Sequence, residues 1–138
     1  MNYLITFFAF ILINTSTETR ELTIIISNIE HIGGTLEIGL FNRGERFMES
    51  GQAYKAISVE VKNSTEKIVI KDLPTGTYAI SLYHDKNSNG ECDRNFFGIP
   101  KEPYAFSNNF KPKFSPPTFN DCKFDLIADK SINIELIN

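Results

Sequence analysis

The sequence contains only two cysteines and two histidines among its 138 residues, and it has no cluster of basic residues. No Cys-x-x-Cys pair and no grouping of Cys with His is present, so a zinc site has no basis. The net charge is −3 and the isoelectric point about 5.4, so nucleic acid meets no basic surface, and an acidic lipid surface is disfavoured for the same reason. The sequence also shows no convincing helix and no internal repeat. Zinc-dependent and nucleic-acid-binding proteins are therefore excluded.

The first residues form an uninterrupted apolar run from Tyr3 to Ile13, followed by the short polar stretch 14–17. This run is too short to cross a bilayer and matches the apolar centre of a signal peptide. A buried first strand or helix is the alternative. We expect residues 1–17 to be a signal peptide and residues 20–138 to form a single domain, exported to the periplasm, the cell surface or the medium.

Apolar and polar residues alternate with a period of two in seven segments of the remaining chain. The first segment, for example, places Leu22, Ile24 and Ile26 on one face. This alternation is typical of strands that bury one face and expose the other. The segments lie near residues 22–27, 35–40, 57–61, 68–70, 78–84, 122–127 and 132–136. They predict an all-β fold, a seven-stranded antiparallel β-sandwich, with a closed barrel as the alternative.

The connection over residues 85–120 is too long for an ordinary turn and too rich in aromatic residues to be disordered. We expect it to be ordered and to fold over one end of the sandwich. Its aromatic residues have two interpretations: they cap the sandwich, or they present a surface to a sugar or peptide. The ligand surface would consist of Tyr104, Phe106, Asn108 and Asn109.

The loop begins with oxygen-bearing residues at alternate positions, which is the first half of a calcium-loop pattern. The expected metal ligands are Asp85, Asn87, Asn89, the carbonyl of Glu91, and Asp93. The pattern is not an EF-hand, because Phe96 occupies the twelfth position, where an EF-hand has a bidentate Glu. Glu102 or Asp121 would have to complete the site. The alternative is a loop rich in turns, since Asp, Asn and Gly are also common turn residues.

The two cysteines and His84 complete the candidate residues. An even cysteine count in an exported chain predicts a disulfide between Cys92 and Cys122, with two buried free thiols as the alternative. His84 stands beside Asp85, which suggests acid–base chemistry. A histidine at the edge of the core is the alternative interpretation, and no complete catalytic constellation can be assembled around it.

Three motifs carry a resemblance to a known family: HDxNxNGxxDxN at 84–95, GIPxExYxFSNN at 98–109, and PPxFxD at 116–121. They resemble a bacterial exported family known as domain of unknown function 2141. The resemblance spans residues 22–136 and implies an exported protein without an established activity. The Leu-Pro-x-Gly-x-Tyr segment at 73–78 is similar to prealbumin-like and carboxypeptidase-regulatory-like sandwiches, which implies a prealbumin-like or immunoglobulin-like β-sandwich. One such fold is a hydroxyisourate hydrolase, but its Tyr-Arg-Gly-Ser tail is absent here.

Taken together, these observations predict an exported, non-enzymatic binding or structural module that Ca²⁺ stabilises. Its partner would be an unknown protein or a glycan at the cell surface. We expect a monomer that binds no nucleic acid and does not insert into a membrane after signal removal. The alternatives are a carbohydrate-binding module that uses the aromatic loop, and a small hydrolase built around His84 and Asp85.

Overall fold

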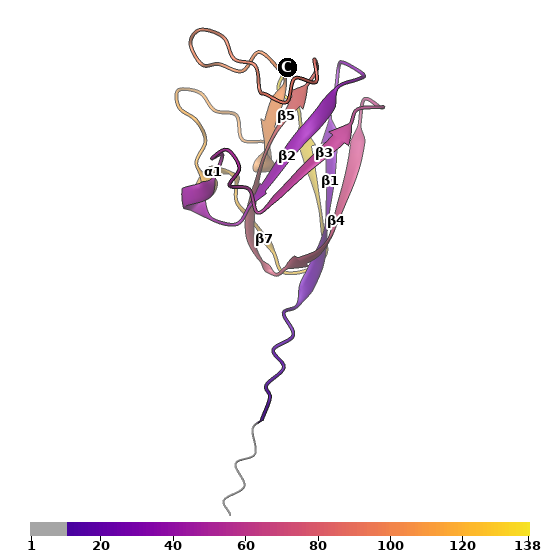
Figure 1. The fold of residues 1–138 in the computed structure, drawn as a ribbon, viewed down its shortest axis with the longest axis vertical. Helices are drawn as coiled ribbons and strands as arrows, with labels where there is room; N and C mark the ends of the chain where they lie inside the picture. The colour runs from indigo at the N-terminus through magenta and orange to yellow at the C-terminus, as the bar shows by residue number, and fades with distance from the viewer. Residues whose placement is uncertain (1–10) are drawn as a thin grey trace, which may run out of the picture.

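The computed structural model describes residues 11–138. The expected signal peptide, residues 1–17, therefore falls largely outside the described residues. Residues 11–18 have no regular secondary structure and lead as an extended segment into the first strand, at the end of the domain that is lowest in Figure 1. Within the described part of the chain, no helix has the length and apolar character needed to cross a membrane.

The predicted all-β sandwich is confirmed, with eight strands instead of seven and with a few short helical turns. A three-stranded sheet has the order β4-β1-β8, and a five-stranded sheet has the order β3-β2-β5-β6, with β7 also paired to β5. Figure 1 shows the long strands of the two sheets packed against each other. The strands are β1 (Thr19–Ser27), β2 (Thr35–Phe41), β3 (Lys55–Glu60), β4 (Glu66–Pro74), β5 (Gly76–Asp85), β6 (Tyr104–Phe106), β7 (Phe124–Leu126) and β8 (Lys130–Glu135).

The core follows the predicted alternation closely. Leu22, Ile24 and Ile26 of β1 are fully buried, and their neighbours in sequence are only half-buried. The side chains that β5 contributes to the same face, Tyr78 to His84 at every second position, are buried as well. Tyr78 fixes the start of β5, because its hydroxyl donates a hydrogen bond to the Pro74 carbonyl 2.6 Å away. Two sheets that each bury one face against the other account for this pattern.

Two features of the topology depart from the prediction. The additional strand, β6, is only three residues long and pairs antiparallel with Ser81–Tyr83 of β5. In addition, β8 pairs parallel with β1, so the sandwich is not purely antiparallel. Short helical turns are present at η1 (Gly44–Arg46), η2 (Ser107–Asn109) and α1 (Phe119–Cys122). Because β6 returns along β5, it divides the long connection into two loops, residues 86–103 and 110–118.

Candidate functional site

The Asp/Asn loop, which we define as residues 85–93, starts where β5 ends beside the turn between β1 and β2. Asp85 is the last residue of β5 and pairs with Thr35 of β2. Gly34 in the neighbouring turn has a φ of +68°, and a methyl group there would overlap the Asp85 carbonyl oxygen. Glycine is therefore required at this position both for its backbone conformation and for the close approach of the two chain segments.

The Asp85 carboxylate holds the loop in a tight turn. Its side chain is buried, with 1% of its surface exposed. Its two oxygens accept hydrogen bonds from the backbone N–H groups of Asn89 at 3.1 Å and Gly90 at 2.8 Å. Hydrogen bonds from backbone amides compensate for the cost of burying a carboxylate. Asp85 thus shapes the loop from its buried end.

Three side chains converge at the exposed side of the loop. The amide nitrogens of Asn87 and Asn89 donate to the two carboxylate oxygens of Asp93, over 2.7 and 2.9 Å. These hydrogen bonds, the one from Asn89 first, hold the pKa of Asp93 below its usual value, because they favour the charged form. Rotation of the two amides about their terminal bonds would turn their oxygens toward the same point.

Glu102 ties the two ends of the loop together. It is buried, and its carboxylate accepts hydrogen bonds from the backbone N–H of Lys86 and of Asp93, both at 3.1 Å. The expectation that Glu102 belongs to this region is therefore met. Asp121 does not belong to it: it forms a capping box with Thr118 at the start of α1. The Glu91 side chain is exposed, and the Glu91 backbone N–H donates to Asn89.

The residues present suit a weak oxygen-liganded cation site. Across residues 11–138, no group of three or more His, Cys, Asp or Glu side chains is arranged to hold a metal. Of the four carboxylates in or beside the loop, Asp85 and Glu102 are already engaged with backbone amides, and that of Glu91 is exposed at the surface. A cation would depend on Asp93 and on the amide oxygens of Asn87 and Asn89. Oxygen ligands of this kind, with little negative charge, fit Ca²⁺ at low affinity.

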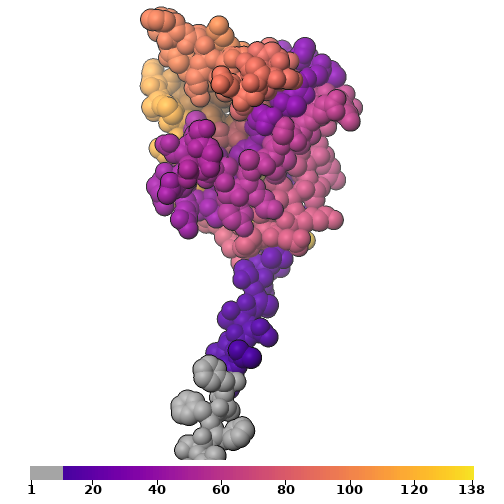
Figure 2. All heavy atoms as spheres, in the orientation of Figure 1, coloured from indigo at the N-terminus to yellow at the C-terminus, as the bar shows by residue number. Residues whose placement is uncertain are grey.

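A rigid hairpin follows directly and ends in two exposed phenylalanines; we call residues 94–100 the aromatic tip. Asn95 organises it: its side-chain oxygen accepts the backbone N–H groups of Phe97 and Ile99, and its own N–H donates to the Ile99 carbonyl at 2.8 Å. Phe96 and Phe97 are 98% and 83% exposed, and their rings meet edge to face. The aromatic tip is the part of the chain near residue 95 that projects at the upper left of Figure 2.

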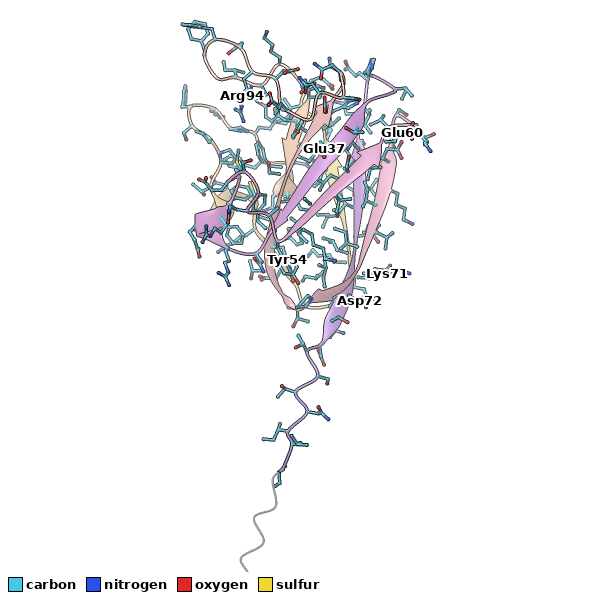
Figure 3. The ribbon with its side chains drawn as sticks, in the orientation of Figure 1. Glu37, Tyr54, Glu60, Lys71, Asp72 and Arg94 are labelled. Atoms are coloured by element: carbon cyan, nitrogen blue, oxygen red, sulfur yellow. The ribbon has the colours of Figure 1, made fainter. Side chains whose placement is uncertain are left out.

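The structure connects the aromatic tip to the Asp/Asn loop through backbone hydrogen bonds. The Lys101 N–H donates to the Asp93 carbonyl at 2.7 Å, while the Asp93 N–H donates to Glu102. Arg94, labelled beside this loop in Figure 3, donates from its guanidinium to the Gly98 carbonyl at 3.0 Å. The role of this segment was not predicted from the sequence. The available signal was Asn95 three residues before Gly98, a common turn pattern.

The residues expected to form a ligand surface have structural roles instead. Phe106 is buried and Tyr104 half-buried, and both pack in a small second core under the loops. Asn108 and Asn109 have positive φ values of 63° and 49°. The Asn108 amide donates to the Lys123 carbonyl, and Asn109 accepts the Glu135 N–H at 2.8 Å, which fixes η2 against β8. The expected surface is therefore only partly accessible: Phe106 is enclosed, Tyr104 is half-buried, and Asn108 and Asn109 are exposed.

The predicted disulfide is also wrong, because Cys92 and Cys122 are both free. The prediction assumed that both lie at the same end of β5. The chain instead returns along β5 through β6, and Ser107 links the Cys122 carbonyl to the backbone of Ile80. Asp85, where the loop of Cys92 begins, is five residues further along β5, or about 16 Å of extended strand. Burial raises the pKa of both thiols, that of Cys122 to about 11.

His84 is a core residue at the end of β5. It is fully buried, and its Nε2 lies 2.7 Å from the Gly33 carbonyl oxygen, so Nε2 carries the proton. Its Nδ1 is the one buried side-chain nitrogen or oxygen in the described residues that makes no hydrogen bond. The exposed His31 ring packs against it at a centroid distance of 5.9 Å. With His84 enclosed and Asp85 bonded to backbone amides, the pair has no access to a substrate.

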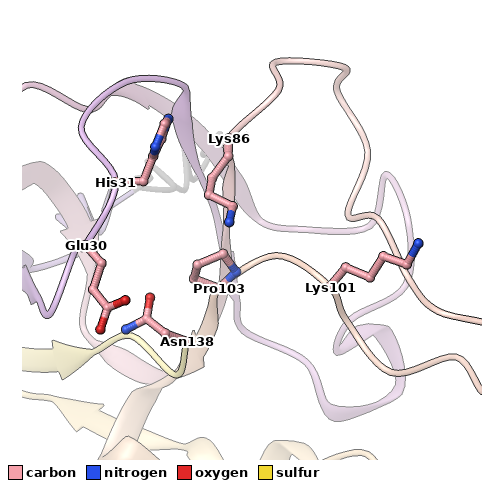
Figure 4. A pocket seen from close by; sticks show the side chains of 6 residues that line it. All are labelled: Glu30, His31, Lys86, Lys101, Pro103 and Asn138. Carbon is pink, nitrogen blue, oxygen red and sulfur yellow. The ribbon is translucent and has the colours of Figure 1, made fainter.

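A shallow pocket lies beside these residues at the base of the Asp/Asn loop. It has a volume of about 420 Å³ and is lined by Glu30, His31, Lys86, Lys101, Pro103 and Asn138. Figure 4 shows the Glu30 carboxylate and the Asn138 amide close to each other, with Lys86 above them and the Lys101 side chain directed away. The pocket is open to solvent and is lined by both positive and negative side chains, so it favours no single class of ligand. None of the expected site residues lines it.

Comparison with known proteins identifies a family but no characterised relative. The model of a family described as "Uncharacterized protein conserved in bacteria (DUF2141)" matches residues 24–135. No curated protein and no solved structure matches the chain.

Proposed function

We propose that this chain, which belongs to the family of uncharacterized proteins conserved in bacteria (DUF2141), is an exported, non-enzymatic binding module. In this proposal, the sandwich is a scaffold, the Asp/Asn loop is a Ca²⁺-binding element, and the aromatic tip is the surface that contacts a partner. The observation that carries the proposal is the pair Phe96 and Phe97, almost fully exposed on a hairpin held by its own hydrogen bonds.

The exposure of the two rings supports a binding role because it is energetically unfavourable in water. Burying one phenylalanine side chain is worth about 1.5–3 kcal/mol. Single exposed apolar residues are common at protein surfaces, but adjacent large ones mark interaction sites. The hydrogen bonds of Asn95 hold both rings outward, so their exposure is part of the folded structure.

The Asp/Asn loop supports a calcium role by its ligand types and its position. Asn87, Asn89 and Asp93 meet at one point, and the backbone of Asp93 is bonded to Lys101 and Glu102 at the base of the aromatic tip. A cation bound there would stabilise the base of the hairpin. With Asp93 as the one carboxylate among these three ligands, we expect a dissociation constant on the order of 10⁻⁴–10⁻³ M.

A carbohydrate-binding module is the second candidate, and the exposed rings of the aromatic tip are the observation that favours it. Its residues would be Phe96 and Phe97 in place of Tyr104 and Phe106. The interplanar angle of the two rings is 86°, so they do not form one flat platform on which a sugar could stack. We therefore rank this candidate second, and a glycan array with the Phe96→Ser variant as control tests it.

Calorimetric titration with Ca²⁺ tests the calcium role. The wild-type protein should bind one Ca²⁺, and Asp93→Asn should weaken binding at least about tenfold, because it removes the one carboxylate among the three proposed side-chain ligands. Asp125→Asn is the matched control: Asp125 is exposed on β7 and bonded to Thr77, away from the loop. Binding that is absent from the wild type, or equal in wild type and Asp93→Asn, would refute the calcium role.

A further inference from the structure

Charge and apolar exposure coincide at the end of the molecule that carries the aromatic tip. Residues 94–118 contain four cationic side chains and one carboxylate, that of the buried Glu102, in a chain whose net charge is −3. The rest of the chain therefore carries an excess of negative charge. The four cations, Arg94, Lys101, Lys111 and Lys113, belong to the two loops that flank β6, residues 86–103 and 110–118.

The two loops that hold these cations both carry exposed aromatic rings. The second loop, residues 110–118, presents Phe114, whose side chain is fully exposed. Both loops project beyond the sheets on the same side of the sandwich, as the orange segments of Figure 1 show. Lys111 and Lys113 closely precede Phe114 in sequence, as Arg94 precedes Phe96. Each exposed ring therefore has an exposed cation within three residues.

We propose that the aromatic tip docks on the surface of a lipid bilayer that contains anionic headgroups, with Phe96 and Phe97 entering the interface and the basic residues contacting lipid phosphates. This inference rests on the proposed function, whose binding surface it assigns to a lipid. The contact is peripheral, through side chains of a hairpin, and no segment spans the membrane.

The shape and charge of the region favour a lipid surface over a folded partner. The rings of Phe96 and Phe97 are nearly perpendicular, at 86°, so they offer no single flat face to a folded partner. A bilayer interface, in contrast, adapts to any protruding aromatic group. An acidic protein is repelled by an anionic membrane except where its basic side chains face that membrane. Basic residues beside apolar anchors are the combination that peripheral membrane binding requires.

Calcium binding would strengthen this contact. Asp93 lies directly before Arg94, so its carboxylate adds a negative charge at the base of the aromatic tip. A cation held by Asn87, Asn89 and Asp93 would neutralise that carboxylate and fix the base of the hairpin. The lipid affinity should therefore rise when calcium is present.

Co-sedimentation with vesicles tests the inference. The full chain is mixed with vesicles of phosphatidylcholine, or of phosphatidylcholine with about one third phosphatidylglycerol, in calcium or in chelator. Binding should require phosphatidylglycerol and weaken at high salt, because screening shortens the range of electrostatic attraction. The double variant Phe96→Ser/Phe97→Ser should lower the partition coefficient at least about tenfold. Arg94→Gln should lower it about fivefold.

The control variant is Ile127→Ser. Ile127 is exposed in the turn after β7, which pairs with the opposite end of β5. All variants carry the same apolar N-terminal run, so a difference between them reports on the aromatic tip alone. Thermal unfolding of each variant in the absence of lipid verifies that the fold is retained.

Equal vesicle binding by the wild type and the double phenylalanine variant overturns the inference, as does equal binding to vesicles with and without phosphatidylglycerol. Calcium binding in calorimetry without vesicle binding overturns the lipid assignment alone and leaves the proposed function standing. If the protein self-associates through the two phenylalanines and does not bind vesicles, the partner is a second copy of the chain, and the lipid assignment is overturned. If vesicle binding depends on the two phenylalanines but is equally strong in calcium and in chelator, the lipid target stands and the contribution of calcium to lipid binding is refuted.

Discussion

The Glu102 carboxylate accepts a hydrogen bond from the backbone N–H of Asp93 at 3.1 Å, and this contact joins the Asp/Asn loop to the segment that returns from the aromatic tip. The other Glu102 oxygen accepts the N–H of Lys86, the first residue after β5. One buried carboxylate thus closes a loop whose ends are fixed to the edge of the sheet. The stability of the loop should depend on this side chain more than on any exposed carboxylate of the sandwich.

Replacing Glu102 by glutamine should destabilise the protein by about 2 kcal/mol, because hydrogen bonds to a charged acceptor are worth about 1.5–3 kcal/mol and the amide group would face an N–H donor. The measurement is the free energy of unfolding from urea denaturation. Glu49→Gln is the control, since Glu49 is exposed and its hydrogen bonds with Arg46 and Gln52 come from its backbone. A loss below about 0.5 kcal/mol for Glu102→Gln would contradict the assigned role.

Replacing Gly34 by alanine should cost about 2 kcal/mol or more beyond the cost of the same change at Gly51. Both glycines have a positive φ, +68° and +71°, so both variants incur a similar backbone penalty. A methyl group at Gly51 meets no atom within 4 Å, whereas at Gly34 it would overlap the Asp85 carbonyl. The difference in unfolding free energy between the variants isolates this overlap. Equal losses of unfolding free energy in the two variants would show that the turn at Gly34 and the end of β5 at Asp85 move apart at little cost.

The protein should lose stability in base as Tyr83 ionises. Burial, followed by the charges of Glu37 and Asp85, raises the pKa of Tyr83 to about 12. Since this pKa is above the value of 10 in the unfolded chain, the folded state holds the proton more strongly. The stability that protonated Tyr83 contributes to the folded state is therefore fully present below pH 10 and is lost as the pH rises from 10 to 12. Urea denaturation across this range should show a smaller decline for Tyr83→Phe than for the wild type, with Tyr54→Phe as the control.

Both cysteines should be detected as thiols without a reductant. In denaturant, a thiol reagent should count two thiols per chain, in agreement with the free Cys92 and Cys122. In the folded protein near neutral pH, Cys122 should react only on unfolding, because it is fully buried and its pKa is raised to about 11. A count of zero thiols in denaturant, restored to two by a reductant, would contradict the structure.

The strands were predictable because the alternation of apolar and polar residues that indicates them lies within each short segment of sequence. Alternation of Leu22, Ile24 and Ile26 with more polar residues predicts both the strand and its buried face, and all seven segments found this way are strands in the structure. The three residues of β6 were missed because such a short segment shows no period. The disulfide prediction failed for the same reason: without β6, Cys92 and Cys122 appear to share one end of the sheet.

The cluster of oxygen-bearing side chains in the Asp/Asn loop was predictable from the sequence, but the exposed surface beside it was not. Asp85, Asn87, Asn89 and Asp93 follow a periodic pattern that the structure brings into one loop. The exposed rings could not be distinguished from the buried ones, because Phe96 and Phe106 differ only in their surroundings. Phe96 lies on a hairpin that Asn95 holds away from the sheets, whereas Phe106 lies on a strand paired with β5.

Amide hydrogen exchange at the base of the aromatic tip tests the central claim most directly, that the Asp/Asn loop binds calcium and thereby stabilises the tip. The amides to follow are those of Asn95, Gly98 and Lys101, whose hydrogen bonds close the hairpin. At a calcium concentration about ten times the dissociation constant, their exchange should slow about tenfold relative to chelator, while exchange in β2 stays the same. Identical exchange at these three amides in calcium and in chelator would contradict the account.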